Sequence, residues 1–209
     1  MSSAAFRTSD FKVFTIAGFT PRMDAIRGRV RPKLEAIGRS LLPDVARVAG
    51  GETYSHVAKH ARRTVNPPSD TWVAFGPDKR GYKKHAHFKV AVSQHCVRFL
   101  LEVGPEHADK KRVAAAWRRD TPRLAPVLHR VKGLAWFKNE HDETPGGLLS
   151  DLSSDLLSHL ADELVRTRDG QIVIGRVVAA AESAKWTDAQ YREAAMETFR
   201  TLGPLYRLT

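Results

Sequence analysis

Three runs in the middle of the chain constrain the fold most: DTWVAFG at 70–76, HFKVAVS at 87–93 and HCVRFLLEV at 95–103. β-Branched and aromatic residues dominate these runs, which is typical of buried strands. A short polar link separates the second run from the third, and such a link suits a β-hairpin. The sequence therefore predicts an antiparallel sheet at the centre of the protein.

Helical patterns lie on both sides of these strands. Thr20-Pro21 predicts the start of a helix, apolar residues follow every three or four positions to Leu41, and Pro32 predicts a kink. The same reasoning predicts further helices and strands, in chain order: a strand at 10–16, a helical pattern from 106 to 131, a strand at 133–139, a helix at 148–168, a strand at 171–178 and a helix at 187–205. This pattern predicts an α+β fold, mostly an antiparallel sheet with helices packed on it, in a single compact domain over residues 1–209.

Charge narrows the classes of partner. The chain of 209 residues carries a net charge of +11 and an isoelectric point near 10.1, which favours anionic partners such as nucleic acid or phosphorylated small molecules. Cys96 is the only cysteine, so a disulfide framework is excluded, and its apolar neighbours predict a buried, inert thiol. No phosphate-binding P-loop, nucleophile elbow or dinucleotide fingerprint is present, and the residues point to no cofactor. We expect a cytoplasmic protein with no membrane association, because neither a signal peptide nor a spanning segment is apparent.

One basic segment stands out between Glu52 and Lys89. Eight Lys and Arg side chains oppose three carboxylates there, a net charge of +5, and four histidines accompany them. These cations flank both ends of the apolar run TWVAF and lie on turns rich in Pro and Gly, where backbone N–H groups can meet phosphate oxygens. We therefore expect a basic cleft for a phosphate-bearing ligand, RNA or a nucleotide. The predicted phosphate-binding side chains are Lys59, Arg62, Arg63, Lys79, Arg80 and Lys83, with Arg22 and Lys33 at the edge, while Asn66 and Tyr82 would orient the ligand.

Two other functions stay open from the residues alone. His56, His60 and His87 are candidate acid–base groups for a metal-independent enzyme that acts on phosphoesters or nucleotides. A metal site is disfavoured although His56 and His60 are spaced to share a helix face, because Val57 stands where a zinc protease needs Glu and the surroundings are basic. Alternatively, the basic segment is an ion-paired brace or docks a protein partner; the oligomeric state is not predicted. The acids at 140–143 are interpreted as a solvated loop.

Three stretches together resemble a known bacterial family: DFKVFTIAGFTPRMDAIRGRVRPKLEAIG, then HVAKHARRTVNPPSDTWVAF with KRGYKKHAHF, then FRTLGPLYR. They are similar to the opening, central and closing motifs of the YktB-like family, a domain of unknown function. The resemblance covers essentially the whole chain and implies a compact α+β domain in a cytoplasmic bacterial protein. It implies no established reaction, cofactor or catalytic residue.

Overall fold

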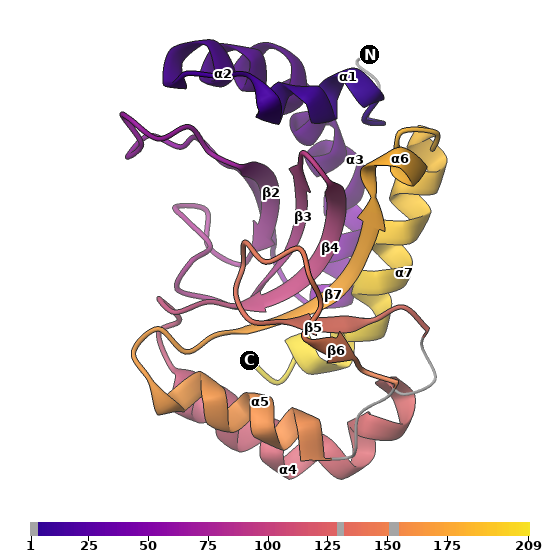
Figure 1. Cartoon of the computed structure of the whole chain (residues 1–209). Helices are drawn as coiled ribbons and strands as arrows, with labels where there is room; N and C mark the ends of the chain where they lie inside the picture. The colour runs from indigo at the N-terminus through magenta and orange to yellow at the C-terminus, as the bar shows by residue number, and fades with distance from the viewer. Residues whose placement is uncertain (1–3, 129–131, 151–154) are drawn as a thin grey trace.

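The computed structural model describes residues 4–128, 132–150 and 155–209, and its centre is a seven-stranded sheet (Figure 1). Every paired neighbour is antiparallel, in the order β1-β2-β3-β4-β7-β5-β6. The strands are β1 (Tyr54–Val57), β2 (Asp70–Gly76), β3 (His87–Ser93), β4 (Cys96–Val103), β5 (Ala135–Phe137), β6 (Gly147–Leu148) and β7 (Ile172–Ala179). The predicted α+β class, the three central strands and the hairpin between β3 and β4 are confirmed.

The helices follow the predicted pattern with two local differences. Helix α2 (Phe19–Ala25) begins one residue before Thr20, and the interruption expected near Pro32 is a π turn at Ile26–Val30 that leads into α3 (Arg31–Ala49). The other long helices are α4 (Lys110–Leu128), α5 (Asp155–Arg166) and α7 (Asp188–Tyr206), with a short α6 (Ala180–Ser183) before the last. Part of the predicted helix at 148–168 and the last three residues of the predicted segment at 106–131 lie outside the described residues.

The strand predicted at 10–16 is wrong. Residues Thr8–Phe11 form helix α1, and a 3₁₀ turn continues it over Lys12–Thr15. The buried Asp10 explains the difference, because its Oδ2 accepts a hydrogen bond from Arg7 N (2.7 Å) and closes the first helical turn. Short apolar runs do not distinguish a strand from a buried helical turn by pattern alone.

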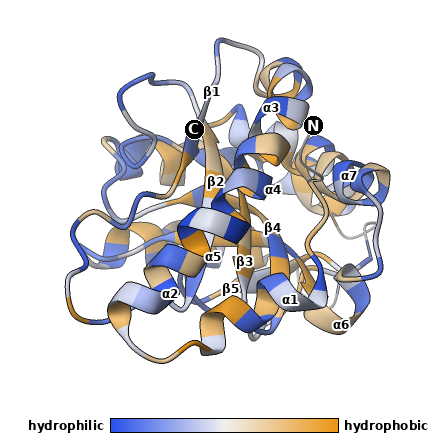
Figure 2. Ribbon diagram, turned by 90° about the horizontal axis from the view of Figure 1, so that it is seen from above, coloured by the Kyte–Doolittle hydropathy of each residue, from blue (hydrophilic) through white to orange (hydrophobic). Residues whose placement is uncertain are grey.

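The main core lies between the sheet and two helices. Helices α3 and α7 pack against each other and cover one face of β2, β3 and β4, and α4 and α5 pair beside the end of the sheet (Figure 1). Side chains such as Phe75, Phe88, Phe99 and Phe199 are fully buried there. Figure 2 shows the consequence from above: the strands are mostly hydrophobic, whereas the helices alternate between hydrophobic and hydrophilic faces.

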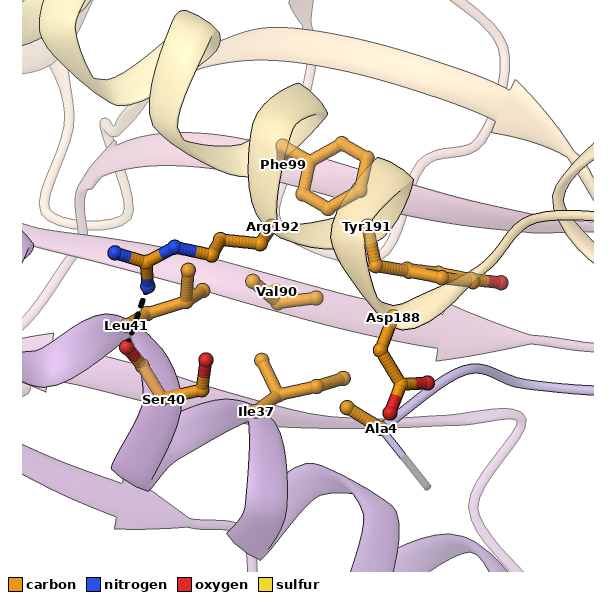
Figure 3. Close-up of a pocket in the computed structure, with 9 residues that line it drawn as sticks. All are labelled: Ala4, Ile37, Ser40, Leu41, Val90, Phe99, Asp188, Tyr191 and Arg192. Atoms are coloured by element: carbon orange, nitrogen blue, oxygen red, sulfur yellow. Dashed lines mark hydrogen bonds between the residues drawn. The ribbon is translucent and has the colours of Figure 1, made fainter.

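A small gap remains in the seam between α3 and α7 (Figure 3). Leu41 of α3, Tyr191 of α7 and Phe99 of β4 line it, and Arg192 Nη1 donates a hydrogen bond to Ser40 O at 2.7 Å. The cavity has a volume of about 10 Å³, at the lower limit for a single water molecule. It is therefore an imperfection of packing rather than a ligand site.

Among residues 4–128, 132–150 and 155–209, no helix combines the length and the apolar character that spanning a bilayer requires.

Candidate functional site

The face of the sheet turned away from α3 and α7 carries charges where a core would ordinarily be apolar. Because successive strand residues point to opposite faces, β2, β3 and β4 present Asp70, Lys89, Arg98 and Glu102 on this second face. All four residues are at most 3% exposed. Two small apolar clusters flank them, one around Trp72 and Ala91 and the other around Leu100, Phe137 and Val173. We call these four residues, with Glu140 and His141, the charged network.

Each charge in the network has a partner of opposite sign. Lys89 Nζ lies 3.0 Å from Glu102 Oε2 and 2.7 Å from Glu140 Oε2, and Arg98 NH2 lies 2.7 Å from Asp70 Oδ2. Burial would lower the pKa of Lys89, but the two carboxylates outweigh it and the pKa lies above its ordinary value. Burial would raise the pKa of Glu102, but the nearby Lys89 and His87 outweigh it and hold this pKa below its ordinary value. Lys89 and Glu102 are therefore both charged at neutral pH.

The loop between β5 and β6 covers the charged network. Figure 1 shows this loop crossing in front of the sheet, and Arg98 NH1 donates hydrogen bonds to the backbone oxygens of Glu140 (2.9 Å) and Asp142 (2.7 Å). His141 Nδ1 donates to Asp70 Oδ1 at 3.1 Å. The interpretation of residues 140–143 as a solvated loop is therefore wrong for Glu140, whose side chain is only 19% exposed because Lys89 draws it onto the sheet.

Aromatic rings continue the site beyond the charges. Trp72 Nε1 donates a hydrogen bond to Tyr82 Oη at 2.7 Å, and the Tyr82 ring lies 4.6 Å from that of His87 and 5.6 Å from that of His56, measured between ring centroids. The His60 ring packs against the Trp72 ring, with 5.3 Å between their centroids, and so joins the same aromatic cluster. Three predicted acid–base candidates and Tyr82 thus converge on one face of the sheet.

His56 and His60 do not share a helix, contrary to the expectation from their spacing. His56 belongs to β1, and His60 lies in the following turn with φ of 50°. His56 Nε2–H donates to Asp78 O, whereas His60 Nε2 is 3.0 Å from Thr71 Oγ1. Burial lowers the pKa of both imidazoles, that of His60 to about 4, so His60 is neutral near pH 7. A general acid or base that works near pH 7 needs a pKa close to that value, so the pKa of His60 does not support this role.

Arg22 and Lys33 were predicted at the edge of the cleft, but their side chains bind to other parts of the protein instead. Arg22 Nε donates to Ile16 O (2.7 Å), and Lys33 Nζ donates to Asp10 Oδ2 (2.6 Å) and Ala5 O (2.8 Å). Lys33 is therefore the counter-ion of a buried carboxylate. Lys83, predicted to bind phosphate, forms an exposed bridge to Glu106 at 3.1 Å.

The remaining predicted ligand residues are exposed and fall into two groups. Lys59, Arg62, Arg63 and Asn66 lie before β2, and Lys79 and Arg80 lie after it. Because β2 has seven residues, the groups are separated by roughly 20 Å along the strand. Within the described ranges, none of these five cations forms an ion pair.

The second group belongs to a loop that lines a pocket, which sequence reasoning did not identify. A cavity of about 470 Å³ is lined by Lys84 and His85 from the β2–β3 loop, His107 and Arg112 near the start of α4, and Arg207 after α7. We call this the basic pocket. Two carboxylates, Glu52 and Asp109, also line it. The loop from Pro77 to Ala86 is thus the element that joins the predicted cations to an actual concavity.

Some residues of the site were visible in the sequence but unrecognised. Charged residues interrupt two apolar runs, Lys89 in HFKVAVS, and Arg98 and Glu102, an even number of positions apart, in CVRFLLEV. An even spacing places charges on the same face of a strand, and this is the signal for a strand with charges on its second face. Arg112 and Arg207 gave no such signal, because only the tertiary fold brings the start of α4 beside the end of α7. Among the residues that the structure describes, no group of three or more His, Cys, Asp or Glu could hold a metal ion.

Comparison with known proteins gives the family. The family model described as "Domain of unknown function (DUF1054)" matches residues 6–206. The chain belongs to the DUF1054 family. It is 34% identical over 206 residues to a UPF0637 protein of Macrococcus caseolyticus, an alignment that covers 99% of this chain and 100% of the relative.

Two further relatives extend this result. A UPF0637 protein of Oceanobacillus iheyensis is 35% identical over 205 residues, with 97% of this chain and 95% of the relative covered. One of Staphylococcus carnosus is 32% identical over 208 residues, with 99% and 100% covered. The resemblance to an uncharacterised bacterial family is confirmed, and these relatives bring no activity with them.

Proposed function

We propose that this DUF1054 protein binds a phosphate-bearing ligand, a nucleotide or RNA, in the basic pocket. The observation that carries the proposal is the convergence of Lys84, Arg112 and Arg207, from three separate parts of the chain, on one cavity of about 470 Å³. That volume lies within the range of small-molecule sites. Arg and Lys are the side chains that recognise phosphate, Arg through its planar fork and Lys as a point charge.

The cations of the basic pocket retain unused hydrogen-bonding capacity. Lys84 forms no ion pair with any described residue, Arg112 Nε is 4.0 Å from Asp109 Oδ2, and Arg207 NH1 donates to Val48 O at 2.8 Å. Asp109 Oδ1 accepts a hydrogen bond from Arg112 N (3.0 Å), so this carboxylate also caps the start of α4. With Glu52 counted, three cations oppose two carboxylates. A phosphate would therefore enter a positively charged site.

The two histidines of the pocket favour an anionic ligand as well. Burial lowers the pKa of His107, and the nearby His85 and Arg112 lower it further. A bound phosphate would reverse this effect, because a negative charge stabilises the imidazolium. Ligand binding and protonation of His107 should therefore be coupled.

The positions of the exposed cations around β2 make different predictions for a nucleotide and for RNA. Lys79 and Arg80 lie on the loop that contributes Pro77, Lys84 and His85 to the basic pocket, whereas Arg62 and Arg63 lie beyond the other end of β2. Only an extended polyanion would contact both groups. RNA binding should therefore weaken steeply between about 50 and 200 mM salt, and nucleotide binding much less.

The test is calorimetric titration of the protein with pyrophosphate, ADP and a short single-stranded RNA at both salt concentrations. The charge reversals Lys84→Glu and Arg112→Glu should each weaken binding by about tenfold or more, since a lost charge-assisted contact is worth roughly 1.5–3 kcal/mol. Arg29→Glu, an equal charge change at an exposed position of the π turn, is the matched control. Equal losses in the control and the pocket variants, or no binding of any of the three ligands, would exclude the basic pocket. Loss of RNA binding alone in Arg62→Glu/Arg63→Glu would favour RNA as the ligand.

A further inference from the structure

A second cavity adjoins the basic pocket. Its volume is about 400 Å³, and its lining residues come from α4 and from the segment that follows α7: Arg112, Ala115, Ala116, Arg119, Arg207 and Leu208. We call it the Ala115 cavity. Arg112 and Arg207 line the basic pocket as well, so the two cavities meet at this pair of arginines.

The lining of the Ala115 cavity differs in chemistry from that of the basic pocket. Ala115, Ala116 and Leu208 make half of it apolar, and none of its described lining residues is a carboxylate or a histidine. The basic pocket, in contrast, is lined by two carboxylates and two histidines. A lining that combines apolar side chains with guanidinium groups suits an uncharged, flat group better than a second phosphate.

The arginines of the Ala115 cavity leave little charge for a second anion. Arg119 Nη2 lies 2.8 Å from Asp120 Oδ2, so this cation already has a counter-ion. Arg112 and Arg207 would contact the phosphate in the basic pocket, and the hydrogen bond from Arg207 Nη1 to Val48 O (2.8 Å) holds that guanidinium where the cavities meet. A guanidinium that binds phosphate along its edge still presents a flat face, and such faces stack on aromatic rings.

The spacing along α4 relates the two cavities. Ala115 and Ala116 follow Arg112 by three and four residues, so they lie on the same side of the helix about one turn, or about 5 Å, further on. A short linker such as ribose bridges a step of this size. A ring joined through a sugar to a phosphate at Arg112 would therefore reach the Ala115 cavity.

We propose that the Ala115 cavity binds the base of a nucleotide whose phosphate is held by Arg112 and Arg207 in the basic pocket. This inference rests on the proposed function and narrows the ligand to a nucleotide, as opposed to an inorganic phosphate or a sugar phosphate. Among the described lining side chains only the arginines form hydrogen bonds, and they are donors. Stacking therefore dominates recognition of the base, and the preference for one base over another is small.

The test compares AMP with ribose 5-phosphate by calorimetric titration at about 50 mM salt. The two ligands have the same phosphate and the same sugar and differ in the base alone. AMP should bind the wild-type protein about tenfold more tightly, as expected for a stacked base. Pyrophosphate, which has no base, measures the basic pocket by itself.

Ala115→Leu fills the cavity without a change of charge at an exposed position of α4. It should remove most of the advantage of AMP and leave the affinities for ribose 5-phosphate and pyrophosphate unchanged. Ala189→Leu is the matched control, because it makes the same change at an exposed position in the first turn of α7, at the end of that helix remote from Arg207. All three affinities should stay as in the wild-type protein.

The failure of this inference differs from the failure of the proposed function. Equal affinities for AMP and ribose 5-phosphate, or an AMP affinity that is the same in Ala115→Leu and Ala189→Leu, would overturn the base site. Pyrophosphate binding that Lys84→Glu weakens would then still support the basic pocket. If pyrophosphate, AMP and ribose 5-phosphate all fail to bind, the phosphate site is wrong and the base site is wrong with it.

Discussion

Lys89 Nζ lies 2.7 Å from Glu140 Oε2 and so fastens the loop between β5 and β6 to strand β3, 51 residues earlier in the chain. The same ammonium also pairs with Glu102 and lies 4.4 Å above the Trp72 ring. One fully buried cation thus organises two carboxylates and an aromatic ring. Its removal is the most informative change that can be made on this face of the sheet.

Lys89→Met should destabilise the protein by about 3–5 kcal/mol, because it leaves buried carboxylates without their counter-ion. The double variant Lys89→Met/Glu102→Leu should lose much less than the sum of the two single variants, since both charges leave together. Urea denaturation followed by circular dichroism measures all three variants. Additive losses would contradict a direct interaction between these two residues.

His141 should make the roof of the charged network sensitive to pH. The hydrogen bond to Asp70 raises the pKa of His141, so the imidazolium is favoured in the folded state. A raised folded pKa stabilises the protein below the ordinary value of 6.5 and loses this contribution as pH rises through the folded value. The pKa of Asp70 is lowered, because His141 and Arg98 outweigh burial, so its carboxylate stays charged down to acid pH.

The difference in urea midpoint between the wild-type protein and His141→Asn isolates this effect from other titrating groups. It should be largest between about pH 5 and 6 and disappear in alkaline solution. A difference that grows with pH, or is constant from acid to alkali, would show that the His141–Asp70 contact does not stabilise the loop.

Gly175 occupies a position in β7 where a side chain would clash with the neighbouring strand β4. It pairs with Leu100 on β4 and Ala135 on β5, and a Cβ at this position would lie 1.9 Å from Phe99 O. Gly175→Ala should therefore force β4 and β7 apart and cost about 1–3 kcal/mol or more. Gly28→Ala, at a position where a Cβ meets nothing within 4 Å, is the control and should leave the melting temperature nearly unchanged. Similar losses in both variants would argue against the tight register of β4 and β7.

Thr187 was predicted as the start of the last helix, and the structure confirms it. Thr187 Oγ1 accepts a hydrogen bond from Gln190 N (3.3 Å), and the Gln190 side chain accepts one from Thr187 N (2.8 Å). Thr187→Ala should cost about 1 kcal/mol. Differential scanning calorimetry would show the change, and an unaltered melting temperature would mean that α7 is held by its packing alone.

The fold was predictable from the sequence where local patterns decide it. Apolar runs with β-branched and aromatic residues located β2, β3 and β4, and three- to fourfold periodicity located α3 and α7. The segment at 10–16 was mispredicted because the deciding residue, Asp10, acts through a cap and through Lys33, 23 residues away. Contacts of this kind are set by the tertiary fold.

The candidate site was predictable only in part. The basic segment includes the β2–β3 loop, but charge alone could not separate Lys33, which neutralises Asp10, from Lys84, which lines a cavity. Net charge counts residues and does not say which of them are already paired. The convergence of the histidines depends on strand pairing, which the sequence does not reveal. The pairing of β1, β2 and β3 brings residues 56 and 87 to the same face of the sheet.

The central claim is that the basic pocket binds phosphate, and His107 reports on it most directly. NMR titration of the His107 imidazole, in the absence and presence of saturating pyrophosphate, measures its pKa in both states. Burial holds this pKa below its ordinary value in the free protein, and a bound anion should raise it, in the wild-type protein but not in Lys84→Glu. An unchanged His107 pKa with pyrophosphate present would contradict the proposed site.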